Sequence, residues 1–480
     1  MQITFRIIKI IGVAGLAWAA VTAGSAAQAV TAASLWGKAQ ELPGVAALNT
    51  GGEADSGPLS CTSDGNCSVG GFYKDGAGNL QAFVANQVNG AWRKAIEVPG
   101  TAALNVDGSA TISAISCPSA GSCSAAGGYA DGSAHLQAFV VSKKKGTWRT
   151  ARGVPGLAAL NAAGNASIIS LSCPAAGNCA AGGFYLASPG HFQPFVVSQV
   201  NGIWRKAIKV PGTSTLNIGG NASIQSVSCA SAGNCAAGGY YDSGSGHFQA
   251  LVVSEVKGVW HKAIEVPGTA ALNDAGNASI NSVSCASAGN CSSGGYYVNS
   301  SGHSEAFADS EVGGVWHKAI EVPGTATLNK GGFGRVNAVS CASAGQCAAG
   351  GAYKDGSGHM QAFVVSQVGG RWHAAIKVPG TAALNTGGTA FLFAMSCSSV
   401  GGCSGGGSYT DGTGHEQAFV VTEVKGTWRK AIEVPGTAGL NEGGTASTEG
   451  VSCASAGECS ATGSYSDGSG HLQAFVVTES

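Results

Sequence analysis

The sequence of 480 residues is poor in charge, and this narrows the kinds of partner that it can have. Only 11% of its residues are Asp, Glu, Lys or Arg, and the 25 basic residues are balanced by 26 acidic ones. A near-neutral chain has no electrostatic reason to bind nucleic acid or an anionic surface, so we expect no nucleic-acid partner. The one run of like charge, Lys143 to Lys145, is expected to be a solvated hairpin tip.

Signatures of helices, metal sites and catalysis are also missing. No unit of the chain shows the 3.6-residue apolar period of a helix, and no Gly-rich phosphate loop or recurring set of nucleophile, base and orienting acid can be found. Turns of the type DGSG offer one carboxylate, fewer than calcium needs, and two cysteines per unit fall short of a zinc site. We therefore predict no metal, no cofactor and no enzymatic activity.

One long apolar run is present, and it lies at the N-terminus. Arg6 and Lys9 precede it, and an A-x-A site follows at Ala27 and Ala29, which is the pattern of a secretory signal peptide. We predict that residues 1–29 are removed and that residues 30–480 form the mature protein, with no membrane span and outside the cytoplasm. Two of the 25 basic residues lie in the signal, which leaves 23.

The rest of the chain is a repeat of 56 residues. Tryptophan recurs at this spacing without a slip. The series is Trp36, Trp92, Trp148, Trp204, Trp260, Trp316, Trp372 and Trp428. A fixed period of this length is typical of a solenoid, a propeller or an array of repeats.

Cysteines follow the same period, with one C-x5-C pair in each unit. Sixteen regularly spaced cysteines in an exported chain favour disulfides, because disulfides persist in oxidising compartments. The predicted pairs are Cys61 with Cys67, Cys117 with Cys123, Cys173 with Cys179, Cys229 with Cys235, Cys285 with Cys291, Cys341 with Cys347, Cys397 with Cys403, and Cys453 with Cys459.

Each unit divides into four short strands separated by Gly, Ser, Asn or Pro. Short links and four antiparallel strands in 56 residues describe a propeller blade, whereas a β-helix would repeat at half this length or less. The mature chain begins with a lone fourth strand, 35–42, and ends with a third strand, 472–479, so each end supplies what the other lacks. We predict an all-β, eight-bladed propeller, forming a single domain over residues 30–480, that closes by pairing the two ends.

The units resemble Kelch-type blades. In those blades a double glycine ends the second strand and is followed by an aromatic residue, a third strand and a Trp, as in Gly70-Gly71-Phe72-Tyr73 and Trp92. Ala126 and Thr462 replace the first glycine in two units, and the Tyr that Kelch units place before the Trp is absent. The C-x5-C pair looks like a feature of secreted bacterial Trp/Cys-repeat proteins. The resemblance implies the propeller fold and carries no activity with it.

The 56-residue spacing also locates the candidate ligand-binding residues. Loops after the second and the fourth strand lie on one face of the predicted propeller, and both are rich in polar residues. The first loop type contributes Asp131, Asp242, Asp355, Asp411 and Asp467, and His135, His191, His247, His303, His359, His415 and His471. The second loop type contributes Asn49, Asn105, Asn161, Asn217, Asn273, Asn329, Asn385 and Asn441.

Two interpretations of these loops stay open. In one, Asn, Asp and His form repeated shallow pockets for a hydroxyl-rich ligand, gaining by avidity. In the other, they hold the turns together. We expect a monomeric binding module for glycans or cell-envelope polysaccharide; the alternatives are a module that binds a secreted or surface protein, a structural scaffold, and a secreted hydrolase or lyase. Departures from the repeat look scattered: Glu53, Asp55, Arg152, Glu305, Asp309, Phe333, Arg335, Phe391, Phe393 and Glu449.

Overall fold

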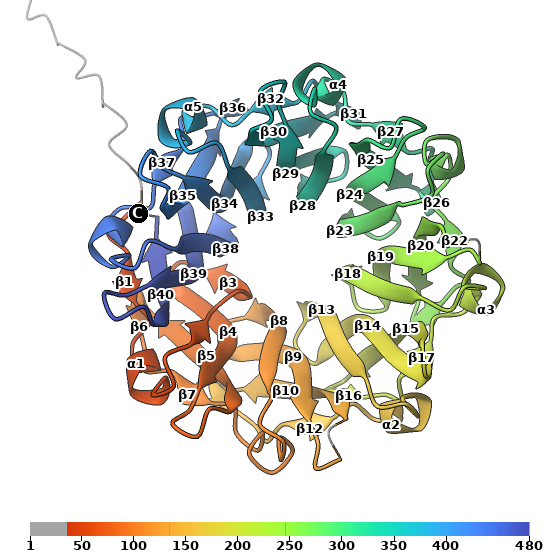
Figure 1. Ribbon diagram of the computed structural model, residues 1–480. Helices are drawn as coiled ribbons and strands as arrows, with labels where there is room; N and C mark the ends of the chain where they lie inside the picture. Colours follow the sequence, from red (N-terminus) through yellow and green to blue (C-terminus); the bar gives the residue numbers. More distant parts are fainter. Residues whose placement is uncertain (1–35, 134, 245, 480) are drawn as a thin grey trace, which may run out of the picture. The chain divides into compact units, whose positions relative to one another are not determined.

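The fold is a closed ring of eight four-stranded antiparallel blades, and the predicted propeller is confirmed (Figure 1). The computed structural model describes residues 36–133, 135–244 and 246–479. The predicted signal peptide lies outside these residues. No helix in the described part of the chain is long and apolar enough to cross a membrane.

Every blade has the same strand order, from the innermost strand beside the central opening to the outermost. The innermost strands are β2 (Ala54–Asp55) with β3 (Leu59–Ser63), β8 (Thr111–Ser119), β13 (Ala166–Ala175), β18 (Ala222–Ser231), β23 (Ser279–Ser287), β28 (Gly334–Ser343), β33 (Ala390–Ser399) and β38 (Ala446–Ser455). The second strands are β4 (Asn66–Lys74), β9 (Ser122–Ala130), β14 (Asn178–Ser188), β19 (Asn234–Asp242), β24 (Asn290–Val298), β29 (Gln346–Lys354), β34 (Gly402–Thr410) and β39 (Glu458–Ser466). The third strands are β5 (Leu80–Val88), β10 (Leu136–Lys144), β15 (His191–Val200), β20 (Phe248–Val256), β25 (Ser304–Val312), β30 (Met360–Val368), β35 (Glu416–Val424) and β40 (Leu472–Thr478).

The predicted fourth strand is split into two short pieces that both pair with the third strand. In the fifth blade these are β26 (Val315–Trp316) and β27 (Ile320–Glu321). The other pieces are β6 (Ala91–Trp92), β7 (Ile96–Glu97), β11 (Thr147–Trp148), β12 (Arg152–Gly153), β16 (Ile203–Trp204), β17 (Ile208–Lys209), β21 (Val259–Trp260), β22 (Ile264–Glu265), β31 (Arg371–Trp372), β32 (Ile376–Lys377), β36 (Thr427–Trp428), β37 (Ile432–Glu433) and β1 (Gln40–Glu41).

The prediction that the chain has no helices is wrong in detail. Seven loops between blades contain a single helical turn, for example α1 (Val45–Leu48), where the Asn49 N–H donates to the Val45 carbonyl. One turn is too short to produce a 3.6-residue pattern in the sequence. The others are α2 (Leu157–Leu160), α3 (Thr213–Leu216), α4 (Thr325–Leu328), α5 (Thr381–Leu384), η1 (Thr269–Ala271) and η2 (Thr437–Gly439).

The two ends of the chain complete the eighth blade together, as predicted. Gln40 and Glu41 of β1 pair with Val476 and Phe475 of β40. The indole N–H of Trp36 donates to Thr422 of the seventh blade at 3.2 Å, as Trp428 of that blade does to Ser366 of the sixth. The N-terminal strand therefore takes the place of the fourth strand of the eighth blade.

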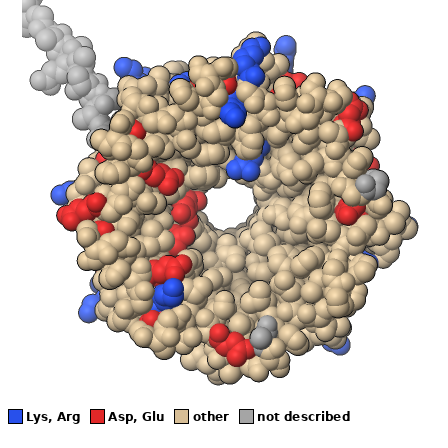
Figure 2. All heavy atoms as spheres, viewed as in Figure 1, with Lys and Arg blue, Asp and Glu red and all other residues tan. Residues whose placement is uncertain are grey.

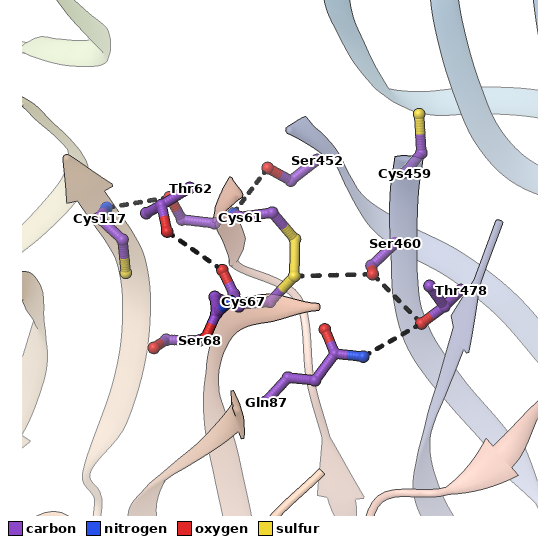
Figure 3. Close-up of a disulfide and its surroundings, with 12 residues drawn as sticks. Cys61, Thr62, Cys67, Ser68, Gln87, Cys117, Ser452, Cys459, Ser460 and Thr478 are labelled. Carbon is purple, nitrogen blue, oxygen red and sulfur yellow. Dashed lines mark hydrogen bonds between the residues drawn. A yellow bond between two sulfur atoms is a disulfide. The ribbon is translucent and has the colours of Figure 1, made fainter. Parts of the chain in front are cut away.

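All eight predicted disulfides are present, and each closes the hairpin between the first two strands of its blade. The residue before the first cysteine is a serine in every unit, and its hydroxyl accepts a hydrogen bond from the backbone N–H of the corresponding cysteine in the next blade. The eight bonds are 2.9 to 3.0 Å long and run from Cys61 to Ser452, Cys117 to Ser60, Cys173 to Ser116, Cys229 to Ser172, Cys285 to Ser228, Cys341 to Ser284, Cys397 to Ser340 and Cys453 to Ser396. Figure 3 shows this contact at the junction of the eighth and first blades.

A second belt of buried polar contacts joins neighbouring blades through their third strands. One side chain per blade reaches a hydroxyl or amide oxygen of the preceding blade, as Gln87 does to Thr478 (Figure 3). The other pairs are Lys143 with Asn86, Gln199 with Ser142, Glu255 with Ser198, Glu311 with Ser254, Gln367 with Ser310, Glu423 with Ser366, and Glu479 with Thr422. Burial raises the pKa of Glu255, and of the other glutamates of this belt, above the ordinary value.

Apolar side chains fill the space between blades, and the recurring Trp and Phe belong to this core. Phe307 and Val252 are fully buried, as are the equivalent residues of most blades. The recurring Tyr is buried too, and its hydroxyl is bonded in five blades, for example from Tyr241 to Glu265 at 2.9 Å. The recurring Tyr is therefore a packing residue whose hydroxyl can still be bonded.

The two positions of the recurring double glycine are glycine for different reasons. A β-carbon at the second glycine, such as Gly71, would clash with the backbone oxygen of Asp55 on the innermost strand, so this position tolerates no side chain. The first glycine faces side chains of the next blade, which can change size in compensation. Thr462 replaces that glycine where the next blade presents the small Ser56, and the two hydroxyls share a hydrogen bond.

Candidate functional site

The predicted loop asparagines are buried and serve the fold. The amide of Asn105 donates to the Leu80 carbonyl at 2.9 Å and to Gln81 at 3.0 Å, while its oxygen accepts the Ser109 N–H at 2.7 Å. All eight members of the series are buried, and each donates to the equivalent carbonyl. These contacts fasten the loop between blades to the loop of the preceding blade and leave the amides little capacity for a ligand.

The predicted aspartates close the loop after the second strand. One oxygen of Asp355 accepts the N–H groups of Ser357 and His359, and the other accepts Gln361 at 2.8 Å. Desolvation alone would raise the pKa of Asp355, but these hydrogen bonds lower it below the ordinary value. Asp131, Asp411 and Asp467 make the same contacts, and Asp242 bonds Gly244.

The predicted histidines are exposed, and each ring lies against a glycine of the next blade. A β-carbon at Gly388, whose φ is +85°, would lie 2.8 Å from the ring of His359. The same contact joins His135 to Gly164, His191 to Gly220, His247 to Gly276, His303 to Gly332, His415 to Gly444 and His471 to Gly52. Of the three predicted sets, only the histidines, which seven of the eight blades have, are exposed at every position.

Two positions of the innermost strand break the symmetry of the ring. They lie at the end of this strand that is nearest to the polar loops, and the second of the two positions is a β-bulge in seven blades. The first position holds Asp55, Thr111, Ser167, Ser223, Ser279, Arg335, Phe391 and Ser447, and the second holds Gly57, Ser113, Ile169, Gln225, Asn281, Asn337, Phe393 and Glu449. We call these sixteen residues the channel mouth.

Charge is unevenly distributed around this mouth. Figure 2 shows an opening through the ring, with acidic side chains on the side where β38 lies and basic ones where β28 lies. Five of the departures that look scattered in the sequence are mouth residues: Asp55, Arg335, Phe391, Phe393 and Glu449. An alignment of the eight units could have revealed these five residues, because they occupy two equivalent positions. None of them belongs to a motif.

The acidic part of the mouth is a carboxyl pair that spans the junction of the eighth and first blades. Glu449 of β38 and Asp55 of β2 share a hydrogen bond, and the Ser464 hydroxyl donates to Glu449 at 3.3 Å. Burial, with the neighbouring Asp55, raises the pKa of Glu449 to about 8, and burial also raises the pKa of Asp55. The pair therefore holds a proton at neutral pH.

The basic part of the mouth is Arg335 on β28. Its guanidinium carbon lies 5.2 Å from the centre of the Phe333 ring, and its Nε is buried without a hydrogen-bond partner. No carboxylate of the described residues lies within ion-pair distance of it. Arg335 therefore keeps donors for a ligand.

The aromatic part of the mouth is a stacked pair on β33. Phe391 and Phe393 lie 5.7 Å apart with ring planes inclined by 10°. Phe393 is 36% exposed, the highest exposure of any large aromatic side chain among the described residues. An exposed ring on an innermost strand suits contact with a ligand.

Glu305 and Asp309, two further departures, are buried inside the fifth blade. Glu305 accepts the Asn329 amide at 2.8 Å, as Gln does in other blades. Asp309 is 3% exposed and accepts a hydrogen bond from Ser293, while its second oxygen has no partner. Six other blades have Val at this position. Burial raises the pKa of Asp309 to about 7.

Replacing this pair by the residues of other blades, Asp309→Val with Ser293→Ala, is expected to stabilise the protein. The unfolded chain loses the Asp309 proton near pH 4 and the folded protein near pH 7, so stability falls as pH rises between them, by roughly 4 kcal/mol from this group. Urea unfolding at pH 4.5 and pH 8 measures the free energy of unfolding of the wild type and of the double variant. The double variant should gain at pH 8 and little at pH 4.5; an equal pH dependence in both proteins would contradict the buried acid.

Hollows between blades lie on the other face, beside the disulfides. Five consecutive junctions, from the first and second blades to the fifth and sixth, have cavities of about 190 to 470 Å³. Lys143 lines two of them. The expectation that Lys143 belongs to a solvated tip is wrong, because it is 6% exposed; Lys144 and Lys145 are exposed as expected. In the described part of the chain no three His, Cys, Asp or Glu side chains lie close enough to hold a metal.

Comparison with known proteins shows a similarity of fold alone. No protein-family model matches the chain, and no curated protein matches it in sequence. Solved structures that resemble it include a Hadza microbial sialidase (10% identity, TM-score 0.35, 72% of this chain and 73% of that one). Others are a polysaccharide lyase acting on ulvan (11%, 0.41, 75% and 90%) and the NanB sialidase of Streptococcus pneumoniae (10%, 0.32, 89% and 68%).

The prediction that the protein is not an enzyme has to be corrected. The three solved structures named above are enzymes, whereas the prediction excluded catalysis. The prediction rested on the absence of a catalytic set that recurs in the units, and the departures from the repeat looked scattered. Five of these departures lie on the innermost strands around one opening, so the absence of a recurring set does not exclude a single site there. At about 10% identity these likenesses carry no substrate to this chain.

Proposed function

We propose that this protein is secreted and binds a glycan or cell-envelope polysaccharide at the channel mouth. The observation that carries the proposal is the stacking of the exposed Phe393 on Phe391 in β33. Binding sites combine such apolar surfaces with a few convergent polar groups, and the mouth supplies Arg335, Asp55 and Glu449 for this purpose. The eight disulfides support a place of action outside the reducing cytoplasm.

The repeated loops support a ligand site less strongly than the mouth does. Their Asn and Asp side chains already hold backbone groups, so a ligand would have to displace bonds of the fold. The exposed His rings could add weak contacts along the rim of a long polymer. A glycan bound at the mouth could therefore extend over this face.

Truncation of Phe393 tests the proposal. The Phe393→Ala variant should bind a polysaccharide recognised by the wild type at least tenfold more weakly, a loss of about 1.4 kcal/mol, because the ligand loses its apolar platform. Calorimetric titration of the oxidised protein, residues 30–480, measures the affinity. Ile218→Ala is the matched control, since Ile218 is 72% exposed in a loop between blades and lies outside the mouth. Equal affinity of the wild type and Phe393→Ala would reject the site.

Cleavage of the bound glycan is a second candidate function, favoured by the raised pKa of Glu449. A carboxylic acid that stays protonated at neutral pH can donate a proton to a leaving group. Because its hydrogen bond with Asp55 places the two groups in contact, they do not match the wider spacing of a glycosidase pair. Glu449→Gln should abolish any release of reducing ends while binding persists, and wild-type activity should fall above pH 8.

A further inference from the structure

Two neighbouring hollows on either side of the second blade are lined by cations and by no acidic residue. The hollow between the first and second blades, about 300 Å³, is lined by Lys143 and Arg93. The hollow between the second and third blades, about 310 Å³, is lined by Lys143, Lys144 and Lys145. Both lie on the disulfide side of the ring, opposite the channel mouth.

Lys143 carries a buried charge without a counter-ion. Its Nζ donates to Asn86 at 2.7 Å and to Ser68 at 3.1 Å, and lies 6.0 Å from the centre of the Trp148 ring. No carboxylate of the described residues is within ion-pair distance. Burial lowers the pKa of Lys143 to about 8. Since buried charges are normally paired, an anion in the adjoining hollow would complete this site.

The other blades provide an internal comparison. At the position of Lys143 they have Gln87, Gln199 and Gln367, or a glutamate. The hollow between the fourth and fifth blades is lined by Glu255 and Glu311 instead, and by no Lys or Arg. The same architecture is therefore basic at one place in the ring and acidic at another, so the basic character of the second blade is not required by the fold.

We propose that the two hollows beside Lys143 form a binding site for sulfate or phosphate groups. A hollow of this size holds one such group with the sugar or other residue that carries it. The group would face the Nζ of Lys143 in one hollow and the Lys144 and Lys145 side chains in the other. The group belongs to a free anion or to an anionic polymer, and the chemistry of recognition is the same in both cases.

Fluorescence titration tests this site, with Trp148 as the internal reporter. The probes are inorganic sulfate, dextran sulfate and uncharged dextran at constant ionic strength. The wild type should bind a sulfated probe, and Lys143→Gln should bind it at least tenfold more weakly. Glutamine occupies this position in three blades, so the variant keeps the belt contact. Lys257→Gln is the control, because Lys257 is an exposed turn lysine that lines the hollow between the third and fourth blades and neither of the two hollows beside Lys143.

Each outcome decides the matter. Binding of inorganic sulfate that Lys143→Gln loses and Lys257→Gln keeps indicates a site for a single anion. Binding of dextran sulfate alone, with the same dependence, indicates a polymer. Absence of binding, or an equal loss in both variants, overturns the proposal. The Lys144→Gln/Lys145→Gln variant tests the second hollow separately. Phe393→Ala should leave binding of the sulfated probe unchanged, so failure of the anion-site proposal can be distinguished from failure of the glycan proposal.

Discussion

Reduction of the eight disulfides is expected to unfold the ring at temperatures where the oxidised protein is stable. Each disulfide closes a short hairpin loop and contributes about 2 kcal/mol in the chain-entropy model. Eight such loops together match or exceed the roughly 5 to 15 kcal/mol by which proteins are normally stable. Thermal unfolding followed by circular dichroism, with and without a phosphine reductant, measures the loss.

A single-blade variant separates the covalent link from the rest of the blade. Cys285→Ala with Cys291→Ala keeps the backbone N–H that donates to Ser228, so only the disulfide is lost. This variant should lose about 2 kcal/mol. A fully reduced protein that melts within a few degrees of the oxidised one would show that packing between blades is sufficient.

Removal of residues 36–42 is expected to open the ring. The shortened chain loses β1, the Trp36 bond to Thr422 and the burial of Leu42, and it exposes the apolar edge of β40. Unpaired edges of this kind associate with other chains. Small-angle scattering and size-exclusion chromatography should show an expanded or oligomeric protein, and a synthetic peptide of residues 34–44 added in trans should restore the compact monomer.

Two tryptophan variants provide the comparison. Trp36 and Trp316 occupy equivalent places, each with an indole bond to the preceding blade. Each Trp→Ala change should therefore cost a similar amount, about 3 to 5 kcal/mol. If Trp36→Ala were harmless while Trp316→Ala was severe, the N-terminal strand would not be part of the eighth blade.

The architecture could be predicted from the sequence because the same residue pattern recurs in eight units. The 56-residue period set the blade count, and the incomplete units at the two ends predicted the closure that β1 and β40 make. The Cys pairing followed from one pair per unit. Split fourth strands and one-turn helices escaped prediction because two- to four-residue elements have no period of their own.

The channel mouth could not be found in this way. Periodicity draws attention to what recurs, and the recurring loop asparagines turned out to be bonded to the fold. Residues such as Arg335 and Glu449 stand 114 positions apart, and only the ring brings their strands around one opening. Lys143 was misjudged for a related reason. Strand β10 alternates between faces, so one lysine of the run is buried while its neighbour Lys144 is exposed.

The claim that function lies where the symmetry breaks is tested most directly by comparing two variants on a panel of polysaccharides. The first carries serine at Asp55, Arg335, Phe391, Phe393 and Glu449, and the second carries alanine at all seven loop histidines. Our account predicts that the mouth variant loses glycan binding and that the histidine variant keeps most of it. Binding that survives in the mouth variant and disappears in the histidine variant would place the site in the repeated loops instead.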